Sequence, residues 1–440
     1  MGTLLNRRRY MGGKYEPLED RIITTFNVVD ASSATKICHT NNVTNKIESV
    51  EIDGVLMGTV SSSYQLSLGD HTIKIRMKDV TETCQNLFYN VTRITSAILP
   101  YCLDKIRNST FYGCSNIEEI DIPYGVTVVD GGTFSGCSKL TEIIIPDSVT
   151  SCSAIFSGCS NIENIVIPIT VTSLENQAFS GCSKLKRVNS NTDGVFYLPN
   201  VKTFGISAFN GCSQAEDITI SSEAASFSTH TFANCTNLKR LNSDTDGVYN
   251  FPLGQKKITS YMFANILALE VINMATDMTS IEGSAFTRCS NLKRVNSTTD
   301  GVFNIPDTVT EIGSMSLWGT QCYDCHIPTG LRTLGYSAFN SSKLSGDIVL
   351  PEGITTLNIN TFDSTLITSC DIPSTVTSIG NQCFSRCSSL ASVTIKATTP
   401  PSLGSSVFPN ATIIYVPAAS VADYQSAWSS LASRIQAIPT

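Results

Sequence analysis

Apolar residues recur along most of the chain in one fixed frame. In residues 131–150, GGTFSGCSKLTEIIIPDSVT, Phe134 is followed by Ile143 and Ile145, and Pro146 closes the run. The two isoleucines flank one outward residue with the two-residue period of a short strand. Proline has no N–H to donate, so it ends that strand. Each copy of the frame therefore predicts one short strand followed by a turn.

The frame returns every 22 to 24 residues, except for three intervals of 30 or 31. Self-similarity at such a period indicates a solenoid. A single copy cannot bury its own apolar face, but stacked copies bury each other's. The apolar anchors of the fourteen copies are Phe88, Phe111, Phe134, Phe156, Phe179, Phe209, Phe232, Phe263, Phe286, Leu317, Phe339, Phe362, Phe384 and Phe408.

The repeated pattern A/T-F-x-G-C-S-x-L-x-x-I-x-I-P-x-x-V-T-x-I resembles the BspA-like leucine-rich repeats, also called the Treponema pallidum type. Clear copies are FSGCSKLTEIIIP, FSGCSNIENIVIP, FTRCSNLKRV and FSRCSSLASVTI, and the resemblance runs from about residue 88 to the C-terminus. It implies a mainly β leucine-rich repeat solenoid of about 14 coils. It also implies adhesion and protein or surface recognition without one common ligand, and it supplies no catalytic residues.

The predicted domain organisation has four parts. The second is expected to be a small antiparallel β domain, because short runs rich in Ile, Val and Thr surround the turn dipeptides Asp53-Gly54 and Gly69-Asp70. It would cap the first coil, whose core and edge are otherwise open; binding or oligomerisation is the alternative role. The parts are 1–20, a basic arm; 21–85, the β domain; 86–415, the repeats; and 416–440, a C-terminal capping helix.

Each end of the chain carries its own pattern. Arg7, Arg8 and Arg9 make the first residues basic, either as a flexible tail or as an arm that anchors on an acidic partner. No apolar segment of signal-peptide length follows them, so no signal peptide is expected. At the other end, an amphipathic helix is predicted to seal the last coil, with its apolar face at Val421, Tyr424, Trp428, Leu431 and Ile435.

Composition and charge narrow the classes of function. Charged residues make up 15% of the chain, below the ~25% of an average soluble protein. The net charge of −7 argues against a nucleic-acid-binding surface. No run of 18 apolar residues exists, so membrane insertion is not expected.

Eight of the sixteen cysteines occupy the position three residues after an anchor: Cys114, Cys137, Cys159, Cys182, Cys212, Cys235, Cys289 and Cys387. Small, mostly apolar residues replace cysteine there in the other copies, which indicates a packing slot filled by free thiols. Disulfides and a metal site are the alternatives.

The three long repeats carry a distinctive insert. They read KRVNSNTDGVFYLP at 186–199, KRLNSDTDGVYNFP at 239–252 and KRVNSTTDGVFNIP at 293–306. Their Asp-Gly dipeptides predict hairpin-like flaps, two coils apart and separated by about 10 Å on one edge of the rod. Inserts on one face of a solenoid often form a binding face; the alternative is decoration carried by a duplicated two-coil unit.

The residues predicted for a binding ridge are Asn189, Thr192, Asp193, Asn242, Thr245, Asp246, Asn296, Thr299 and Asp300, with Trp318 as a further exposed contact. The aspartates are expected to pair with the Lys-Arg dipeptides before the flaps, which would leave the ridge nearly neutral.

Candidate chemistry is sparse. The string Cys322-Tyr-Asp-Cys325-His326 matches a haem-attachment motif, but it fits a normal coil, and either a local disulfide or two inert thiols is expected there. The four histidines lie in separate segments, and none is expected to have the hydrogen-bonded partner that a general base needs. No enzyme activity, cofactor or metal is predicted.

These patterns predict recognition or assembly through an extended polar surface. The first expectation is a bacteriophage virion component, such as a fibre or decoration protein located in the particle and contacting the host surface or neighbouring virion proteins. The alternatives are a bacterial or protist cell-surface adhesin that binds a host protein or glycan, and an intracellular scaffold. Assembly of copies through the N-terminal region is a further expectation, and no nucleic-acid partner is expected.

Overall fold

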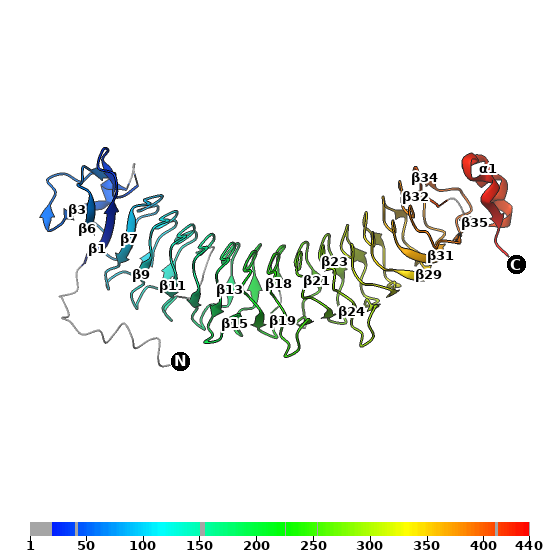
Figure 1. The fold of residues 1–440 in the computed structure, drawn as a ribbon, viewed down its shortest axis with the longest axis horizontal. Helices are drawn as coiled ribbons and strands as arrows, with labels where there is room; N and C mark the ends of the chain where they lie inside the picture. The colour runs from blue at the N-terminus through cyan, green and yellow to red at the C-terminus, as the bar shows by residue number, and fades with distance from the viewer. Residues whose placement is uncertain are drawn as a thin grey trace.

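The computed structural model is a curved rod of stacked coils (Figure 1). It describes residues 20–39, 43–149, 155–224, 226–252, 254–409 and 412–439. An antiparallel sheet forms the N-terminal end, and helix α1 lies at the C-terminal end. The predicted mainly β solenoid is confirmed. Arg7, Arg8 and Arg9 lie outside the described residues.

The N-terminal domain is built on one antiparallel sheet with the strand order β4-β3-β6-β1, which continues into β7 and β9 of the first coils. The Asp53-Gly54 turn is confirmed, with φ of 48° and 84°, whereas Gly69-Asp70 opens strand β6 instead of forming a turn. The elements are β1 Ile22–Val28, β2 Thr35–Lys36, η1 Thr44–Lys46, β3 Ile47–Ile52, β4 Val55–Leu56, β5 Ser63–Tyr64, β6 Gly69–Met77, β7 Ile94–Ile98 and β9 Glu119–Asp121.

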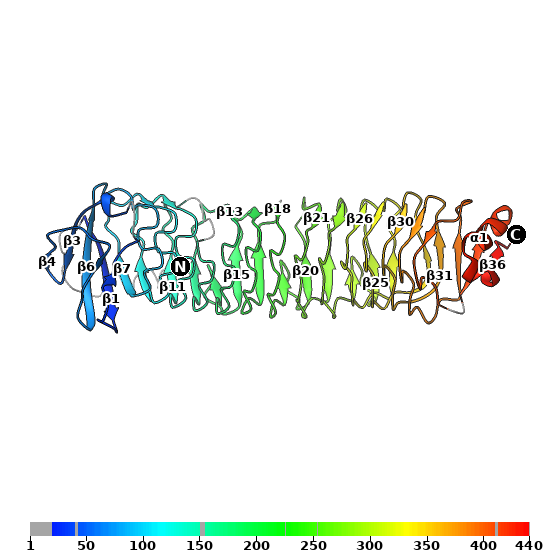
Figure 2. The ribbon, with the colours of Figure 1, turned by 90° about the horizontal axis from the view of Figure 1, so that it is seen from above.

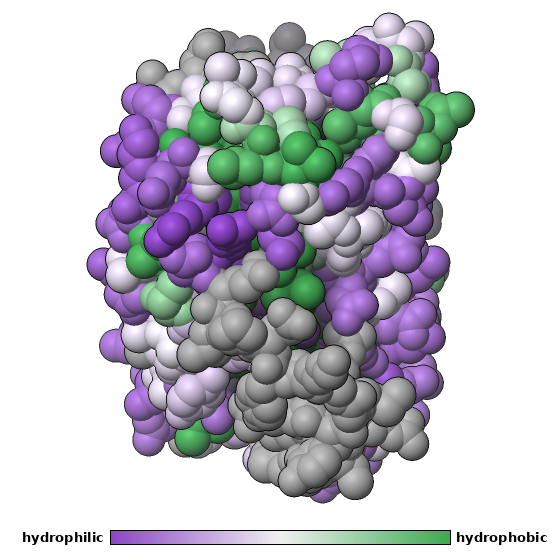
Figure 3. All heavy atoms as spheres, turned by 90° about the vertical axis from the view of Figure 1, so that its left-hand side faces the viewer, coloured by the Kyte–Doolittle hydropathy of each residue, from purple (hydrophilic) through white to green (hydrophobic). Residues whose placement is uncertain are grey.

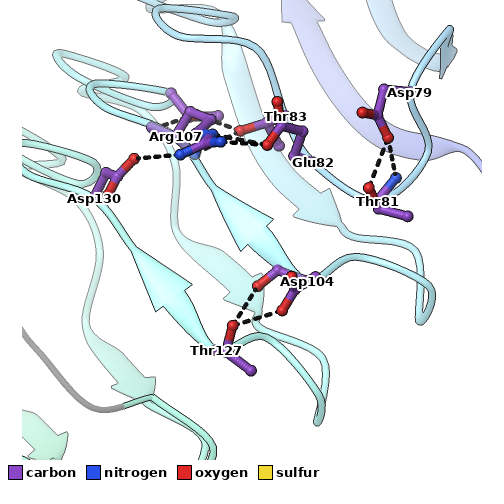
Figure 4. A network of polar contacts seen from close by, with 9 residues as sticks. Asp79, Thr81, Glu82, Thr83, Asp104, Arg107, Thr127 and Asp130 are labelled. Atoms are coloured by element: carbon purple, nitrogen blue, oxygen red, sulfur yellow. Dashed lines mark hydrogen bonds and ion pairs between the residues drawn. The ribbon is translucent and has the colours of Figure 1, made fainter.

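Polar contacts join this domain to the coils. Arg107 donates through Nε and Nη2 to Oε2 of Glu82 at 3.0 and 2.5 Å, and its Nη1 lies 3.6 Å from Asp130 (Figure 4). Thr127 donates to Asp104 of the preceding coil at 2.5 Å, so the same kind of contact continues between the coils.

The outer end of the N-terminal domain exposes a group of hydrophobic side chains (Figure 3). They are Val29, Val55, Leu56 and Leu68.

The coils stack through parallel strands that run across the rod (Figure 2). One sheet holds eleven strands: β11 Glu142–Ile144, β12 Asn164–Val166, β14 Arg187–Val188, β15 Val195–Leu198, β17 Asp217–Ile220, β19 Arg240–Leu241, β20 Val248–Asn250, β22 Val271–Asn273, β24 Arg294–Val295, β25 Val302–Asn304 and β27 Asp324–His326. A five-stranded sheet follows it: β29 Ser345–Val349, β31 Leu366–Ile372, β33 Ser392–Ile395, β35 Ile413–Val416 and β36 Ile435–Ala437.

A second side of most coils carries two-residue strands. They form β8 Lys105–Ile106 with β10 Val128–Val129; β13 Ser173–Leu174, β16 Thr203–Phe204 and β18 Ser226–Phe227; β21 Lys257–Ile258, β23 Ser280–Ile281, β26 Glu311–Ile312 and β28 Thr333–Leu334; and β30 Thr356–Leu357, β32 Ser378–Ile379 and β34 Ser402–Leu403. Figure 1 places β15, β19 and β24 on the outer, convex side of the curve.

The anchor residues form a continuous spine. All fourteen are buried, and consecutive rings stack at centroid distances such as 5.8 Å for Phe111–Phe134 and 5.5 Å for Phe179–Phe209. Leu317 interrupts the stack, which resumes at Phe339–Phe362 with 5.7 Å. The prediction that the anchors point inward is confirmed.

The thiols three residues after the anchors fill a buried slot, as predicted, and also link neighbouring coils. Each donates its S–H to the carbonyl of the anchor one coil earlier; for example, Cys182 Sγ lies 3.1 Å from the Phe156 oxygen and Cys235 Sγ lies 3.2 Å from that of Phe209. Every cysteine in the described residues is a free thiol. Burial raises the pKa of Cys159 and Cys235 to about 12, so these thiols stay protonated at neutral pH.

The C-terminal end is closed by less helix than predicted. α1 spans Val421–Ala427 between the short turns η2 Ala418–Ser420 and η3 Ser429–Arg434. Ile435, predicted on the helical face, lies in β36, which pairs with β35 and extends the sheet by one strand. Tyr424 and Trp428 cover the core, and Trp428 packs 6.3 Å from Phe408 at the end of the spine.

Candidate functional site

The insert of each long repeat adds a strand to the eleven-stranded sheet. After β14 the chain turns through residues 189–194 and returns as β15, which pairs in parallel with β14 through Val188 and Phe196. The same happens between β19 and β20 and between β24 and β25. The predicted hairpin-like flaps are therefore wrong, because the inserted residues continue the parallel sheet and only their connecting loops project.

The extra strands also change the predicted spacing of the loops. The order β14-β15-β17-β19 puts three strand steps between one loop and the next. At ~4.8 Å per step that is about 14 Å, and the expected value of about 10 Å is wrong. The insert loops are the segments 189–194, 242–247 and 296–301; they lie on one edge of the rod, near β15, β19 and β24 (Figure 1).

The first residue of each insert loop is an asparagine in a left-handed conformation. Asn189, Asn242 and Asn296 have φ of 50°, 49° and 47°, which asparagine tolerates better than most residues. Asn189 Oδ1 accepts the N–H of Ile167 in the preceding coil at 2.7 Å, and the other two asparagines make the equivalent bond. These three members of the predicted ridge thus hold the loops in place.

The rest of each loop has the same backbone bonds in all three copies. In the first, Ser190 Oγ accepts the N–H of Thr192 at 3.1 Å, and the N–H of Gly194 donates to the Lys186 carbonyl at 2.8 Å. Gly194 has φ of 81°, and a Cβ there would lie 2.9 Å from the side chain of Glu216. The loops are therefore built as three rigid, equivalent units.

Ion pairs cancel most of the charge around the loops. Arg187 lies 3.5 Å from Asp193, Arg240 lies 3.1 Å from Asp246, and Arg294 lies 3.3 Å from Asp300. The predicted pairing of these aspartates is confirmed. The neighbouring lysines pair with the preceding coil: Lys186 with Glu163 at 3.1 Å, Lys239 with Glu216 at 2.8 Å and Lys293 with Glu270 at 2.9 Å.

The remaining predicted ridge residues are exposed at the tips of the loops: Thr192, Asp193, Thr245, Asp246, Thr299 and Asp300. Trp318, which was expected to be exposed, is half-buried next to the spine position Leu317. Its side chain belongs to the coil in which the aromatic stack is interrupted.

The sequence alone did not reveal a row of amides on the outward face of the sheet beside the loops. Asn250, Asn273 and Asn304 lie on β20, β22 and β25, and Asn242 and Asn296 directly follow β19 and β24 in the same register. Asn273 Nδ2 donates to Asn250 Oδ1 at 2.7 Å, and Asn250 Nδ2 donates to the Asn242 carbonyl at 2.8 Å. The sequence signal was that Asn250 and Asn304 each stand two residues before a proline, Pro252 and Pro306. The register of the inserted strands was needed to align them with the other asparagines.

The CxxCH string lies in an ordinary coil. Cys322 and Cys325 are buried free thiols, and burial raises the pKa of Cys322 well above its usual value. His326 ends β27 and contacts Asp307 Oδ1 at 3.0 Å. The N–H of Thr329 and the His326 ring lower the pKa of Asp307 to about 2. Of the two expected arrangements, the structure has the free thiols.

Two histidines have carboxylate partners, so the expectation of unpaired histidines is wrong. Besides His326, His71 places Nδ1 2.7 Å from Asp53 and Nε2 3.0 Å from the Ser67 carbonyl. Ser67 Oγ lies 3.4 Å from Nε2, which puts Ser, His and Asp together. The Nε2–H donates to a carbonyl, however, so this nitrogen is not available to take the serine proton, and His71 ties two turns of the N-terminal domain together.

Neither a metal site nor a membrane-spanning helix is present among the residues that the structure describes. Residues 20–39, 43–149, 155–224, 226–252, 254–409 and 412–439 hold no group of three or more His, Cys, Asp or Glu side chains placed to bind a metal ion. No helix within those residues is both long and apolar enough to cross a bilayer.

The sequence matches the model of the BspA type leucine-rich repeat region, in 6 copies, over residues 69–154, 152–293, 245–314 and 310–423. The chain belongs to this family. BspA-type repeat proteins are recognition proteins, and the match supports surface adhesion or protein interaction better than the first expectation of a virion component. The search of curated proteins found no match.

Three solved structures are similar to this BspA-type chain. A leucine-rich repeat protein from Bacteroides ovatus is 18% identical, with a TM-score of 0.47 over 79% of this chain and 95% of that one. A leucine-rich cell surface protein from Faecalibacterium prausnitzii is 26% identical, with a TM-score of 0.42 over 72% and 76%. The pneumococcal vaccine antigen PcpA is 17% identical, with a TM-score of 0.34 over 82% and 84%. At such scores these likenesses carry no argument about function.

Proposed function

We propose that this BspA-type protein is a non-catalytic adhesin that recognises a component of a cell surface through the insert loops and the sheet face beside them. The observation that carries the proposal is the threefold repetition of one rigid loop. Each copy exposes a threonine and an aspartate at its tip, on the same edge of the rod. Identical groups at a fixed spacing suit a repetitive or extended target.

The energetics of the surface favour recognition by many weak contacts. Exposed ion pairs contribute about 0–1 kcal/mol each, so the paired charges around the loops mainly remove net charge. Side chains whose backbone is already ordered lose less freedom on binding than those of a mobile loop. Several equivalent contacts on one rigid rod then add to the avidity for a target that repeats.

A binding assay on intact cells tests this function. The fluorescently labelled full chain is measured by flow cytometry on Gram-negative bacteria, Gram-positive bacteria and mammalian epithelial cells. The variant combines Thr192→Glu, Thr245→Glu and Thr299→Glu, which adds charge at the loop tips. The control combines Asn200→Glu, Ser222→Glu and Thr276→Glu at exposed positions of the same region. We expect the loop variant to lose at least tenfold in binding and the control to keep it. Absence of binding to all cells, or equal binding by both variants, would overturn the proposal.

A further inference from the structure

A nine-strand segment of the outer face repeats every three strands. From β14 to β27, the outward residues at one position read Arg187, Val195, Asp217, Arg240, Val248, Val271, Arg294, Val302 and Asp324. The position two residues later reads Asn189, Tyr197, Thr219, Asn242, Asn250, Asn273, Asn296, Asn304 and His326. The segment thus combines a row of valines between charged side chains with a row of amides and one tyrosine.

The geometry points to a binding track for a neutral, extended polysaccharide along this segment, a proposal that rests on the recognition function above. The first argument is charge. The arginines and lysines of the segment pair with aspartates and glutamates at 2.8–3.5 Å. A track whose positive charges are already compensated offers little to a phosphate backbone or a polyanion, and it fits an uncharged ligand.

The second argument is hydrogen bonding. Amide side chains both donate and accept, as hydroxyl groups do. Asn273, at the centre of the amide row, and Asn304, at its end, are exposed. Neighbouring strands lie ~4.8 Å apart, which is comparable with the length of one sugar ring along an extended chain. Successive sugars can therefore meet successive amides in the same way.

The third argument is the apolar part of the track. Tyr197 is 45% exposed on β15, and Tyr323, 47% exposed, packs over Gly301 of the third insert loop. Seven strand steps separate β15 from β27, about 34 Å. At each end of the track, the face of a tyrosine ring can stack on the C–H face of a sugar. The surface between the two tyrosines is lined by the half-buried Val195, Val248 and Val302.

The same face is poorly suited to a globular protein partner. Protein interfaces concentrate their affinity in a few large, desolvated anchors, chiefly Trp, Tyr and Arg, at the centre of a patch. Here the two exposed tyrosines lie at opposite ends, and each arginine is engaged by an aspartate. An extended peptide that adds a strand needs a free sheet edge, whereas the amides lie on the face.

Two measurements on the full chain test the track. In affinity electrophoresis, gels contain mixed-linkage β-glucan, arabinoxylan or galactomannan as neutral probes, or hyaluronan as an anionic control. Binding to cells is measured in parallel after the cells are treated with periodate, which destroys sugar rings, or with protease. The variant Asn273→Ala with Asn304→Ala is compared with Asn200→Ala, and Tyr197→Ala is an independent second variant. Circular dichroism and thermal unfolding confirm that each variant is folded.

We expect periodate to abolish binding to cells and protease to leave it. We also expect the double amide variant and Tyr197→Ala each to weaken binding at least fivefold, while Asn200→Ala keeps it. Retardation by a neutral gel and none by hyaluronan would agree. Binding that resists periodate and is lost after protease would overturn the polysaccharide track but leave the recognition function standing. The same conclusion would follow if the amide and Tyr197 variants bound as well as the parent protein while the loop-tip variant stayed defective. Retardation by hyaluronan alone would also overturn it.

Discussion

The short coils and the long coils share one core but differ on the outer sheet. Between Phe134 and Phe156, in short coils, the ring centroids are 5.9 Å apart; between Phe232 and Phe263, across an insert, they are 5.8 Å apart. The insert therefore leaves the aromatic spine unchanged. Its whole effect falls on the eleven-stranded sheet, which gains one strand in each long coil while the opposite sheets gain none.

This difference explains how a repeat can vary without losing its fold. The anchor, the thiol and the strand residues are fixed by contacts with the coils before and after, so an insert must leave them in register. The outer sheet can take an extra strand because that strand pairs in parallel with its neighbours and buries apolar side chains such as Phe196 and Phe303. One side of the rod becomes longer by ~4.8 Å for each extra strand, and that side is the convex one (Figure 1).

The largest expected effect is on the shape of the whole molecule. The deletion removes residues 189–196, 242–249 and 296–303. The strand before each insert is then joined to the residue that follows the paired position in the inserted strand, so the convex side loses three strands. We expect a straighter rod, which small-angle X-ray scattering would detect as a larger maximum dimension of the molecule. Deleting one insert should have about a third of the effect, and an unchanged profile would mean that the inserts do not set the curvature.

The second effect is loss of stability at high pH, and it should be equal in both kinds of coil. The folded protein keeps the thiol protons of Cys159, in a short coil, and Cys235, in a long coil, up to a pKa of about 12, whereas an unfolded cysteine loses its proton near pH ~8.5. Unfolding therefore releases these protons above pH ~8.5, and the free energy of unfolding falls by about 1.4 kcal/mol per pH unit for each thiol. Urea unfolding between pH 8 and 11 should show this slope reduced equally by Cys159→Ala and Cys235→Ala. A slope that neither substitution changes would contradict the burial argument.

The third effect concerns the spine. Phe134→Ala in a short coil and Phe232→Ala in a long coil each leave a cavity among fully buried rings, at a cost of about 3–5 kcal/mol. Chemical denaturation measures both, and the two costs should agree because the spine is the same. Tyr336→Ala, at a position 49% exposed, is the matched control and should cost less than about 0.5 kcal/mol. A clear difference between the two phenylalanines would show that the inserts do weaken the core.

The smallest effect belongs to the long coils alone. Asn242→Ala removes the acceptor for the Ile220 N–H at 2.9 Å and places alanine at φ of 49°. We expect a cost of about 1–2 kcal/mol in thermal or chemical unfolding. Asn200→Ala, at an exposed turn of the same region, should stay within about 0.5 kcal/mol of the parent protein. Equal costs would mean that the loop asparagine has no structural role.

The sequence by itself determined the solenoid, because the period of its apolar residues is a local property. Phe134, Cys137 and Ile143 are buried for the same reason: a coil can hide them only against another coil. The ion pairs of Asp193, Asp246 and Asp300 were equally predictable, since the partners lie six or seven residues away along the chain.

The tertiary structure decided everything that depends on register between coils. The Asp-Gly dipeptides in the long repeats are turn signals whether the returning strand runs antiparallel or parallel, and only the hydrogen bonds to the next coil select the parallel sheet. The amide row exists because Asn242 and Asn250, eight residues apart, come to lie side by side when β19 pairs with β20, next to Asn273. The contact between His71 and Asp53 likewise joins strand β6 to the turn between β3 and β4 of the N-terminal sheet. Such contacts form across strands, and the periodicity along one chain does not contain them.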